Sequence, residues 1–262
     1  AQPETLIKAD PQNADGNFAL GVLDANDRNF DEAAKRFAPL LKSERDPAAA
    51  FQLGRIEEQR KNYEKALSYY EMVTTLPQAL DAAVRRAAAL SQLGRMKDAR
   101  TVMVALRERF PQFEERFWLA EADMLGDAGQ PEEALKVYEA AFAEMPDSAD
   151  LLYGRSLIYE RQDKIDLSEK DLRAILKQDP DDARAMNALG YMLVVHTKRL
   201  KEARELIAKA HELDPDDAAI MDSLGWVQFK LGDAKAARDV LGQALGKLQD
   251  PEIAAHLGEV LW

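Results

Sequence analysis

Hydrophobic and polar residues follow one another along this chain in pairs of amphipathic stretches, each pair joined by a short polar turn. The apolar positions fall on one face at helical spacing. The turns often contain glycine, as at Gly94 and Gly232. The stretches are rich in Ala, Leu, Glu, Lys, Arg and Gln, which lose little rotamer freedom in a helix. The pattern predicts an all-α chain of helical hairpins.

Small residues mark the hairpins at a regular interval. One small residue recurs at steps of 33 to 35 residues, at Gly21, Gly54, Ala87, Ala122, Ser156, Gly190, Gly225 and Gly258. A second follows after 12 positions, or 13 in the sixth unit, at Ala33, Ala66, Ala99, Ala134, Ser168, Ala203 and Ala237. Small side chains on both stretches let two helix axes approach to about 8–10 Å. The extra residue, near 196–200, is expected to be a tolerated loop insertion or, alternatively, a docking feature.

Proline and aspartate mark the unit boundaries. Prolines close most units, at Pro77, Pro111, Pro146, Pro180, Pro215 and Pro251. Proline cannot continue a helix, so each is expected to follow a helix end. Acidic pairs then begin the next helix, as at Asp181–Asp182 and Asp216–Asp217. Negative charge is favourable there, next to the positive end of the helix dipole.

These spacings resemble the tetratricopeptide repeat over nearly the whole chain. Residues 223–227 fit the first helix of that repeat, and residues 132–138 fit the second. The resemblance implies an all-α, right-handed superhelical solenoid of antiparallel helix pairs, in a single domain over 1–262. The predicted repeats are 14–46, 47–79, 80–113, 115–148, 149–182, 183–217 and 218–251, with a partial repeat at 1–11 and a truncated one at 252–262.

Charge and composition narrow the class of partner. The formal net charge of −12 disfavours binding to nucleic acid, since a negative protein repels phosphate backbones. The chain has no cysteine, so disulfides, thiol catalysis and cysteine-bound metals are excluded. The absence of an apolar run of about 18 residues predicts no transmembrane helix. Protein partners are therefore expected.

Motifs for catalysis, cofactors and metals are missing. The three histidines, His196, His211 and His256, lie in different units, and none belongs to a His-Glu-x-x-His pair. Phosphate-binding glycine loops and activated-serine motifs are likewise absent. The aspartate clusters lack calcium-loop spacing and are interpreted as helix caps. The sequence predicts a non-enzyme with no cofactor.

In tetratricopeptide arrays the first helices line the concave face, so the resemblance places the binding surface there. Helical spacing puts ten residues on that stripe as predicted partner contacts: Phe18, Phe51, Arg55, Tyr153, Leu157, Asn187, Tyr191, Val194, Trp226 and Phe229. The same stripe holds Val22, Glu58, Val84, Leu119 and Asp123. Aromatic residues that remain partly exposed are typical anchors, although each could instead pack between units. The Lys/Arg/Asn clamp of chaperone adaptors is absent from these positions.

The C-terminal quarter of the chain has a closer resemblance. Residues 187–262, and above all 219–227 and 250–262, are similar to bacterial outer-membrane tetratricopeptide lipoproteins. One such group includes the lipoprotein partner of a carboxyl-terminal processing protease. The resemblance implies an adaptor that docks the protease and peptidoglycan-hydrolase substrates in the periplasm. It also implies a lipid anchor outside this chain. The alternatives are an envelope or pilus assembly scaffold, or the recognition arm of a larger enzyme.

Both ends of the chain predict a longer array. Residues 1–10 fit the second helix of a preceding unit, and 251–262 fit a first helix without its partner. We therefore expect an exposed apolar face at Ile253, Leu257, Val260 and Leu261, because solenoids normally end in a polar capping helix.

Overall fold

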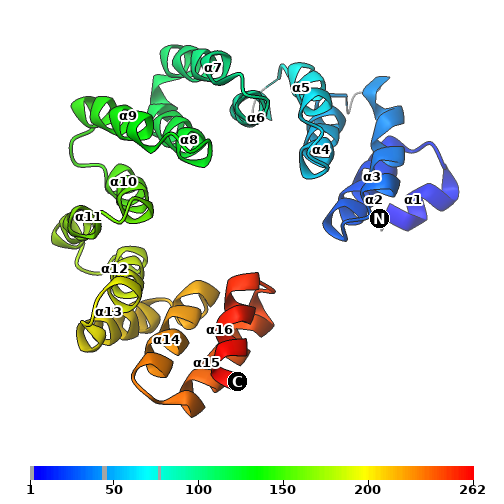
Figure 1. The fold of residues 1–262 in the computed structure, drawn as a ribbon. Coiled ribbons are helices and arrows are strands. Elements are labelled where there is room, and N and C mark those ends of the chain that lie inside the picture. Colours follow the sequence, from blue (N-terminus) through cyan, green and yellow to red (C-terminus); the bar gives the residue numbers. More distant parts are fainter. Residues whose placement is uncertain (1–2, 43–45, 76–77) are drawn as a thin grey trace. The chain divides into compact units, whose positions relative to one another are not determined.

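The computed structural model describes residues 3–42, 46–75 and 78–262, and in this part of the chain all regular elements are helices (Figure 1). The chain divides into two compact units, residues 1–133 and 134–262. The expected all-α class is confirmed, while one continuous 262-residue domain stays a prediction.

The first unit is built of successive helix pairs. Its elements are α1 (Pro3–Ala9), α2 (Ala14–Asn26), α3 (Phe30–Phe37), the 3-10 turn η1 (Ala38–Lys42), α4 (Asp46–Gln59), α5 (Tyr63–Glu71), α6 (Gln78–Gln92), α7 (Met96–Arg109), η2 (Pro111–Phe113) and α8 (Glu114–Asp127). Helices α2, α4, α6 and α8 are the first helices of their repeats, and α6 packs on both α4 and α8.

The second unit repeats this order from α9 (Pro131–Glu144), the helix within which the division falls. Its other elements are α10 (Ala149–Arg161), α11 (Ile165–Gln178), α12 (Ala183–His196), α13 (Leu200–Leu213), α14 (Ala218–Lys230), α15 (Ala234–Lys247) and α16 (Pro251–Leu261). Helix α14 packs on α12 and on α16 as well as on its hairpin partner α15.

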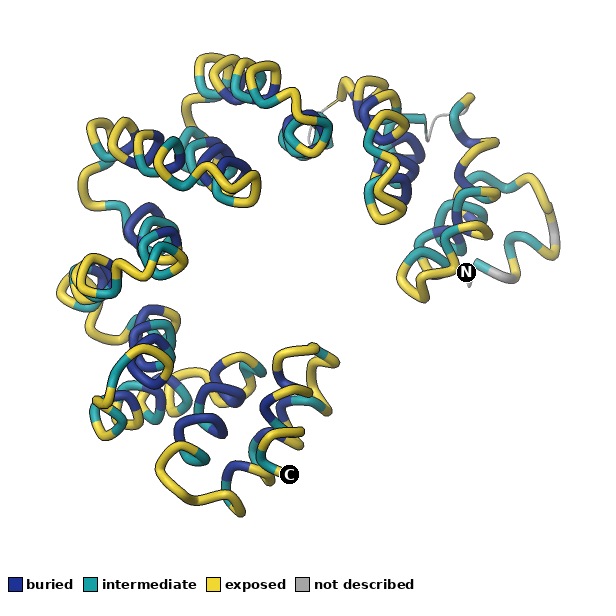
Figure 2. The backbone as a smooth tube through the Cα atoms, in the orientation of Figure 1, coloured by how far each residue is buried: buried dark blue, intermediate teal, exposed yellow. Residues whose placement is uncertain are grey.

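Hairpins close because a small residue on the first helix faces a large one on the second. A β-carbon at Gly54 would come within 2.5 Å of the Tyr70 ring, and one at Gly190 within 2.5 Å of Ile207. Gly21 stands in the same relation to Phe37. Buried residues accordingly lie along the facing sides of the helices, while the turns are exposed (Figure 2). The sequence analysis identified the glycines but missed the large partner, which lies 16 or 17 positions later.

Helix starts are capped as the aspartate pattern predicts. Asp182 accepts a hydrogen bond from the Ala185 backbone N–H at 2.8 Å, and Asp217 accepts from Ile220 at 2.9 Å. Within hairpins, Gly94 and Gly232 adopt φ values of +74° and +94°, which glycine tolerates without strain. The turns are thus specified by local chemistry.

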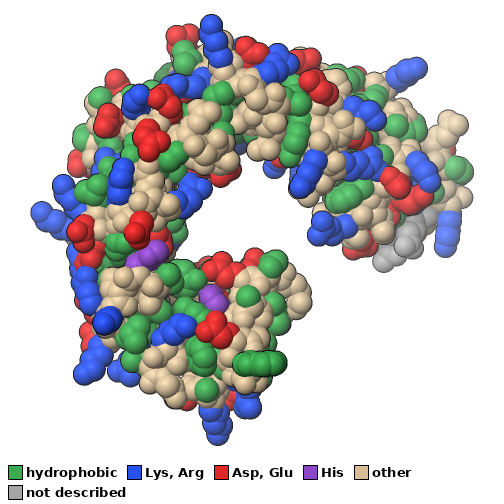
Figure 3. All heavy atoms as spheres, in the orientation of Figure 1, with side chains coloured by type: hydrophobic (Ala, Val, Ile, Leu, Met, Phe, Trp, Pro, Cys, Tyr) green, Lys and Arg blue, Asp and Glu red, His purple; other side chains and the backbone are tan. Residues whose placement is uncertain are grey.

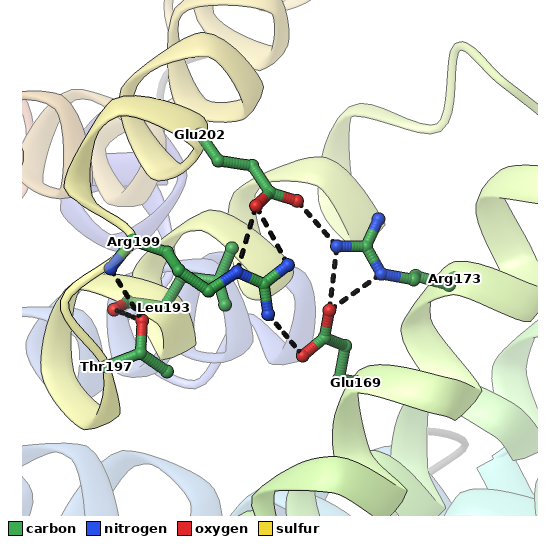
Figure 4. A network of polar contacts seen from close by, with 6 residues as sticks. All are labelled: Glu169, Arg173, Leu193, Thr197, Arg199 and Glu202. Carbon is green, nitrogen blue, oxygen red and sulfur yellow. Dashed lines mark hydrogen bonds and ion pairs between the residues drawn. The ribbon is translucent and has the colours of Figure 1, made fainter.

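The extra residue of the sixth hairpin is accommodated by a threonine. Thr197 donates its hydroxyl to the Leu193 carbonyl at 2.7 Å and accepts the Arg199 N–H at 3.0 Å. Arg199 is thereby held in a ring of ion pairs with Glu169, Arg173 and Glu202 (Figure 4). The lengthened turn is ordered by its own hydrogen bonds and fixed to helix α11.

The C-terminal helix α16 is packed more completely than expected. Ile253 is buried in a cluster with Met221 and Ala244, so its predicted exposure is wrong. Leu257 and Val260 are half-buried, whereas Leu261 is 63% exposed. Proline at the first position and Asp250 as N-cap begin this helix. Among the described helices, none has the length and hydropathy needed to cross a bilayer.

Candidate protein-binding surfaces

The first helices of the first unit border an open groove of about 570 Å³. Helix α4 contributes Phe51, Arg55 and Glu58, and α6 contributes Val84 and Arg85. Asp81, Ala88 and Arg116 complete the lining. The structure therefore brings together Phe51 and Arg55, two of the predicted contacts, in one hollow.

Most charges of this groove are already paired. Arg85 lies 3.1 Å from the Glu58 carboxylate, which also accepts the Tyr70 hydroxyl at 2.5 Å. Burial and the bond to Glu58 raise the pKa of Tyr70 far above its usual range, so Tyr70 remains a neutral donor. Arg116 forms an ion pair with Asp81. The groove therefore combines paired charges with the apolar side chains of Phe51, Val84 and Ala88.

Phe18, on α2, takes a different position. It is half-buried and meets Phe37 edge-on with ring centroids 5.5 Å apart. Phe51 similarly packs at 6.1 Å from the Tyr70 ring. Each aromatic residue thus packs inside its hairpin and remains half-buried.

In the second unit, four side chains from three successive first helices form an aromatic cluster, defined here as Tyr191, Trp226, Phe229 and His256. The Trp226 ring stacks on His256 with centroids 4.1 Å apart, and Phe229 lies at 5.6 Å from Trp226. The Tyr191 ring is 6.2 Å from His256. Three of the members were predicted contacts, and the sequence reasoning missed His256 because it was sought only as part of a catalytic motif.

A buried hydrogen-bonded contact between His256 and Asp222 supports this cluster. His256 Nδ1 lies 2.9 Å and 3.0 Å from the two carboxylate oxygens of Asp222. Burial raises the pKa of Asp222, while its bond to His256 opposes that change. At the edge of the cluster, Tyr191 donates to Glu252 at 2.7 Å, and burial raises the Tyr191 pKa. The pair links α14 to α16 and fixes the ring of His256.

Two of the predicted contacts are buried, which corrects the expectation that they present surface to a partner. Trp226 is only 7% exposed and Val194 only 6%. Both belong to the core of the second unit, together with Leu189 and Val227. The Lys230 ammonium covers the Trp226 ring at 3.9 Å from its centroid. These residues pack between repeats, the alternative that the spacing left open.

Other predicted contacts of the second unit remain accessible. Leu157 on α10 is 38% exposed, and Tyr153, Asn187, Tyr191 and Phe229 are half-buried. The Asn187 Oδ1 atom is buried and has no hydrogen-bond partner among the described residues. The Arg184 guanidinium lies over the Tyr153 ring at 4.4 Å.

The structure also shows a buried carboxylate that sequence reasoning missed. Glu121 on α8 is 1% exposed and receives Arg100 at 2.8 Å and Arg107 at 2.7 Å. The Arg107 guanidinium in turn lies 3.6 Å from the centroid of the Trp118 ring. Both oxygens of Glu121 are thus occupied by guanidinium groups, which is typical of a structural ion pair rather than a reactive site. No group of histidines and carboxylates in the described residues has metal-binding geometry.

A chain of antiparallel helix pairs, in which small residues face large ones at an interval of about 34 residues, defines the class of helical-hairpin repeat proteins. Family models described as tetratricopeptide repeat match residues 18–83, 119–169, 159–218 and 195–259. The chain therefore belongs to the tetratricopeptide repeat family. Its repeats make it a protein–protein interaction scaffold.

Known proteins resemble the chain to different degrees. The TPR repeat-containing protein PA4667 of Pseudomonas aeruginosa is 38% identical over 212 residues, which cover 81% of this chain and 36% of that protein. The chain thus spans about a third of the length of this relative.

Two solved structures share the fold. A tetratricopeptide repeat protein from Parabacteroides merdae superposes with a TM-score of 0.62 at 13% identity, covering 95% of this chain and 99% of the other. PilF of Pseudomonas aeruginosa has a TM-score of 0.50 at 22% identity, covering 55% and 66% of the two chains. At these identities the likeness concerns the fold alone.

Proposed function

We propose that this chain is the non-catalytic docking part of a periplasmic adaptor, which binds a carboxyl-terminal processing protease and presents cell-wall hydrolases to it. The observation that carries the proposal is the row of partly exposed apolar and aromatic residues on the first helices. Leu157, Tyr191 and Phe229 lie there, and tight glycine contacts fix the hairpins of Tyr191 and Phe229. Such preorganised anchors supply affinity at low entropic cost.

The particular partner is proposed from the resemblance of residues 187–262 to outer-membrane tetratricopeptide lipoproteins, one group of which includes the partner of a carboxyl-terminal processing protease. The 38% identity to PA4667 over 81% of the chain supports a tetratricopeptide repeat protein. The proposal places the protein in the periplasm, attached to the outer membrane by a lipid on a segment outside this chain. The match covers only 36% of PA4667, so it does not identify the partners of this chain. The protease and its substrates are therefore part of what we propose.

In this proposal the scaffold acts by bringing the protease and its substrate close together. A scaffold that holds protease and substrate together raises the effective concentration of one at the other, so hydrolysis accelerates without any reactive group on the scaffold. The protease supplies the chemistry and the repeats supply positioning. In an assembly scaffold, the alternative function, the same surfaces would hold structural envelope components instead.

The test is a crosslinking pull-down of the full-length protein from its own envelope, read by mass spectrometry. The adaptor proposal expects a carboxyl-terminal processing protease and cell-wall hydrolases among the crosslinked proteins. In a reconstituted assay, addition of the protein should then accelerate degradation of the hydrolase. Recovery of envelope assembly components without a protease would favour the alternative and contradict the adaptor role.

Substitutions on the first helices test whether these helices bind the protease recovered in the pull-down. Leu157→Ala combined with Phe229→Ala should reduce the recovered protease about tenfold, as expected when anchors worth about 1–2 kcal/mol are removed. Leu167→Ala is the matched control, because Leu167 is a similarly exposed leucine, at 42%, on the second helix α11. Equal losses in both variants would show that the first-helix surface is not the docking surface.

A further inference from the structure

Helix α4 presents a cationic side chain, Arg55, that takes part in none of the ion pairs described above. Arg55 is exposed, and its one hydrogen bond among the described residues is to the Gln52 amide at 3.4 Å. Within residues 3–42, 46–75 and 78–262, no carboxylate lies within ion-pair distance of its guanidinium. A planar guanidinium with free donors is suited to bidentate binding of a carboxylate.

The acidic groups near Arg55 are occupied by other donors. Glu58, one turn further along α4, binds Arg85 and the Tyr70 hydroxyl. Asp81 on α6 is paired with Arg116. Both carboxylates that line the groove with Arg55 are thus already paired, which leaves its guanidinium for a carboxylate of a partner.

Arg55 lies where two hollows adjoin. It lines the groove with Phe51 and Val84, and it also lines a second hollow of about 330 Å³ with Val22 and Phe30. Gln52 and Gln59 border the second hollow and offer amide groups. A segment crossing α4 would thus have apolar contacts on both sides of the guanidinium and side-chain amides along its backbone.

The local charge is opposite to that of the whole chain. The two hollows are lined by four arginines, Arg28, Arg55, Arg85 and Arg116, against the two carboxylates Glu58 and Asp81. The full chain nevertheless carries a net charge of −12. Basic side chains gather over α4 and its neighbours in the space-filling view (Figure 3). A positive patch in an acidic protein selects acidic segments of a partner by attraction here and by repulsion elsewhere.

We propose that the groove across α4 binds an extended acidic segment of a partner protein, with an internal Asp or Glu carboxylate on Arg55 and apolar neighbours in the hollows on either side. The proposal rests on the scaffold function proposed above and names the chemistry that one of its surfaces recognises. An internal carboxylate fits better than a chain terminus, because the hollows continue on both sides of Arg55. Glu58 and Asp81 in the lining disfavour a polyphosphate ligand.

The test is selection of a random peptide library, capped at both ends, against the purified chain and two variants. Arg55→Gln removes the charge, and Lys65→Gln is the control, because Lys65 is an exposed cation on the second helix α5 of the same hairpin. The wild type and Lys65→Gln should enrich peptides with Asp or Glu flanked by apolar residues, whereas Arg55→Gln should not. Selection of no acidic residues by the wild type, or the same enrichment with Arg55→Gln, would overturn the proposal.

A quantitative arm uses the most enriched acidic peptide and its Glu→Gln or Asp→Asn counterpart in fluorescence anisotropy titrations. The amide peptide should bind the wild type about tenfold more weakly, and Arg55→Gln should bind both peptides equally. A third peptide, whose only carboxylate is its free C-terminus, should also bind weakly. Binding of this peptide as tight as that of the internal acid would contradict the internal site.

The outcome is separable from that of the scaffold proposal. Circular dichroism should give the same helicity and melting temperature for Arg55→Gln and the wild type, because Arg55 is exposed and its one hydrogen bond among the described residues is long, at 3.4 Å. If the envelope pull-down succeeds while the library shows no acidic preference, the scaffold function stands and this recognition chemistry fails. If neither the library nor the pull-down yields a ligand, both proposals fail.

Discussion

Gly225 on α14 and Leu241 on α15 approach so closely that a β-carbon at position 225 would lie 2.5 Å from Leu241 Cγ. The contact sets the distance between the helices of the last complete hairpin. The recurring small residue is therefore needed because it leaves room for a large side chain of the paired helix, and not because it forms a turn. The same relation at Gly54 and Tyr70 makes it a property of the repeat.

Gly225→Ala should therefore destabilise the second unit, although alanine is the better helix former. We expect a loss of about 1–3 kcal/mol from overpacking, since Leu241 and the Ala237 carbonyl must both move. Gly242→Ala is the control, because a β-carbon there meets nothing within 4 Å. It should stabilise α15 by about 0.5–1 kcal/mol. Thermal and urea unfolding of both variants check the prediction, and a stabilised Gly225→Ala would contradict it.

Removing one partner of the buried Glu121 pair should cost more than removing an exposed pair. Arg107→Met leaves the 2%-exposed side chain of Glu121 with Arg100 alone, which predicts a loss of about 3 kcal/mol. Arg95→Met removes the exposed pair with Asp98 and should cost less than about 1 kcal/mol. Similar urea midpoints for the two variants would show that Glu121 is better solvated than its burial indicates.

The ion-pair ring at the lengthened turn should make the second unit sensitive to acid. Hydrogen bonds from Arg199 and Arg173 lower the pKa values of Glu169 and Glu202 below 4.5. Because their pKa values are lowered in the folded state, these carboxylates stabilise it above about pH 4.5. The contribution is lost as the pH falls through the lowered values.

The measurement is the melting temperature between pH 6 and pH 3. Glu169→Gln combined with Glu202→Gln should flatten the acid side of this profile relative to the wild type. The difference should be modest, since Glu202 and both arginines are partly exposed and solvent screens them. An unchanged slope in the double variant would remove the ring as a source of acid sensitivity.

Trp226→Ala should act on folding before it acts on binding. The ring is 7% exposed and stacks on His256, so its removal leaves a cavity between α14 and α16. We expect a loss of about 3 kcal/mol, seen as a lower melting temperature and weaker helix signal. Leu231→Ala, at an exposed leucine, should have little effect. An unaltered melting temperature with lost partner binding would instead identify Trp226 as a surface anchor.

Much of the fold could be predicted from sequence because it depends on local chemistry. Helical periodicity, glycine turns and aspartate caps are each specified within a few residues, and their repetition in phase removes ambiguity about the hairpin order. The cap of α12 shows this: Asp182 is read as a cap from its position after Pro180 and is found bound to the Ala185 N–H. The binding surface was harder to predict. Helical spacing tells which way a side chain points from its helix, but not whether a neighbouring helix covers it.

What the sequence by itself determined is the all-α hairpin repeat, its phase and the stripe of first-helix residues, because these follow from the intrinsic geometry of one helix and its turns. Tertiary structure decided which residues of that stripe are covered and which charges are paired. Trp226 is buried by α16, and His256 meets Asp222 across 34 residues of sequence. Arg55 has no carboxylate partner in the described part of the chain, where Arg85 and Tyr70 already bind Glu58. Such outcomes depend on which side chains of neighbouring helices bind one another. The spacing of residues within a single helix carries no information about these contacts.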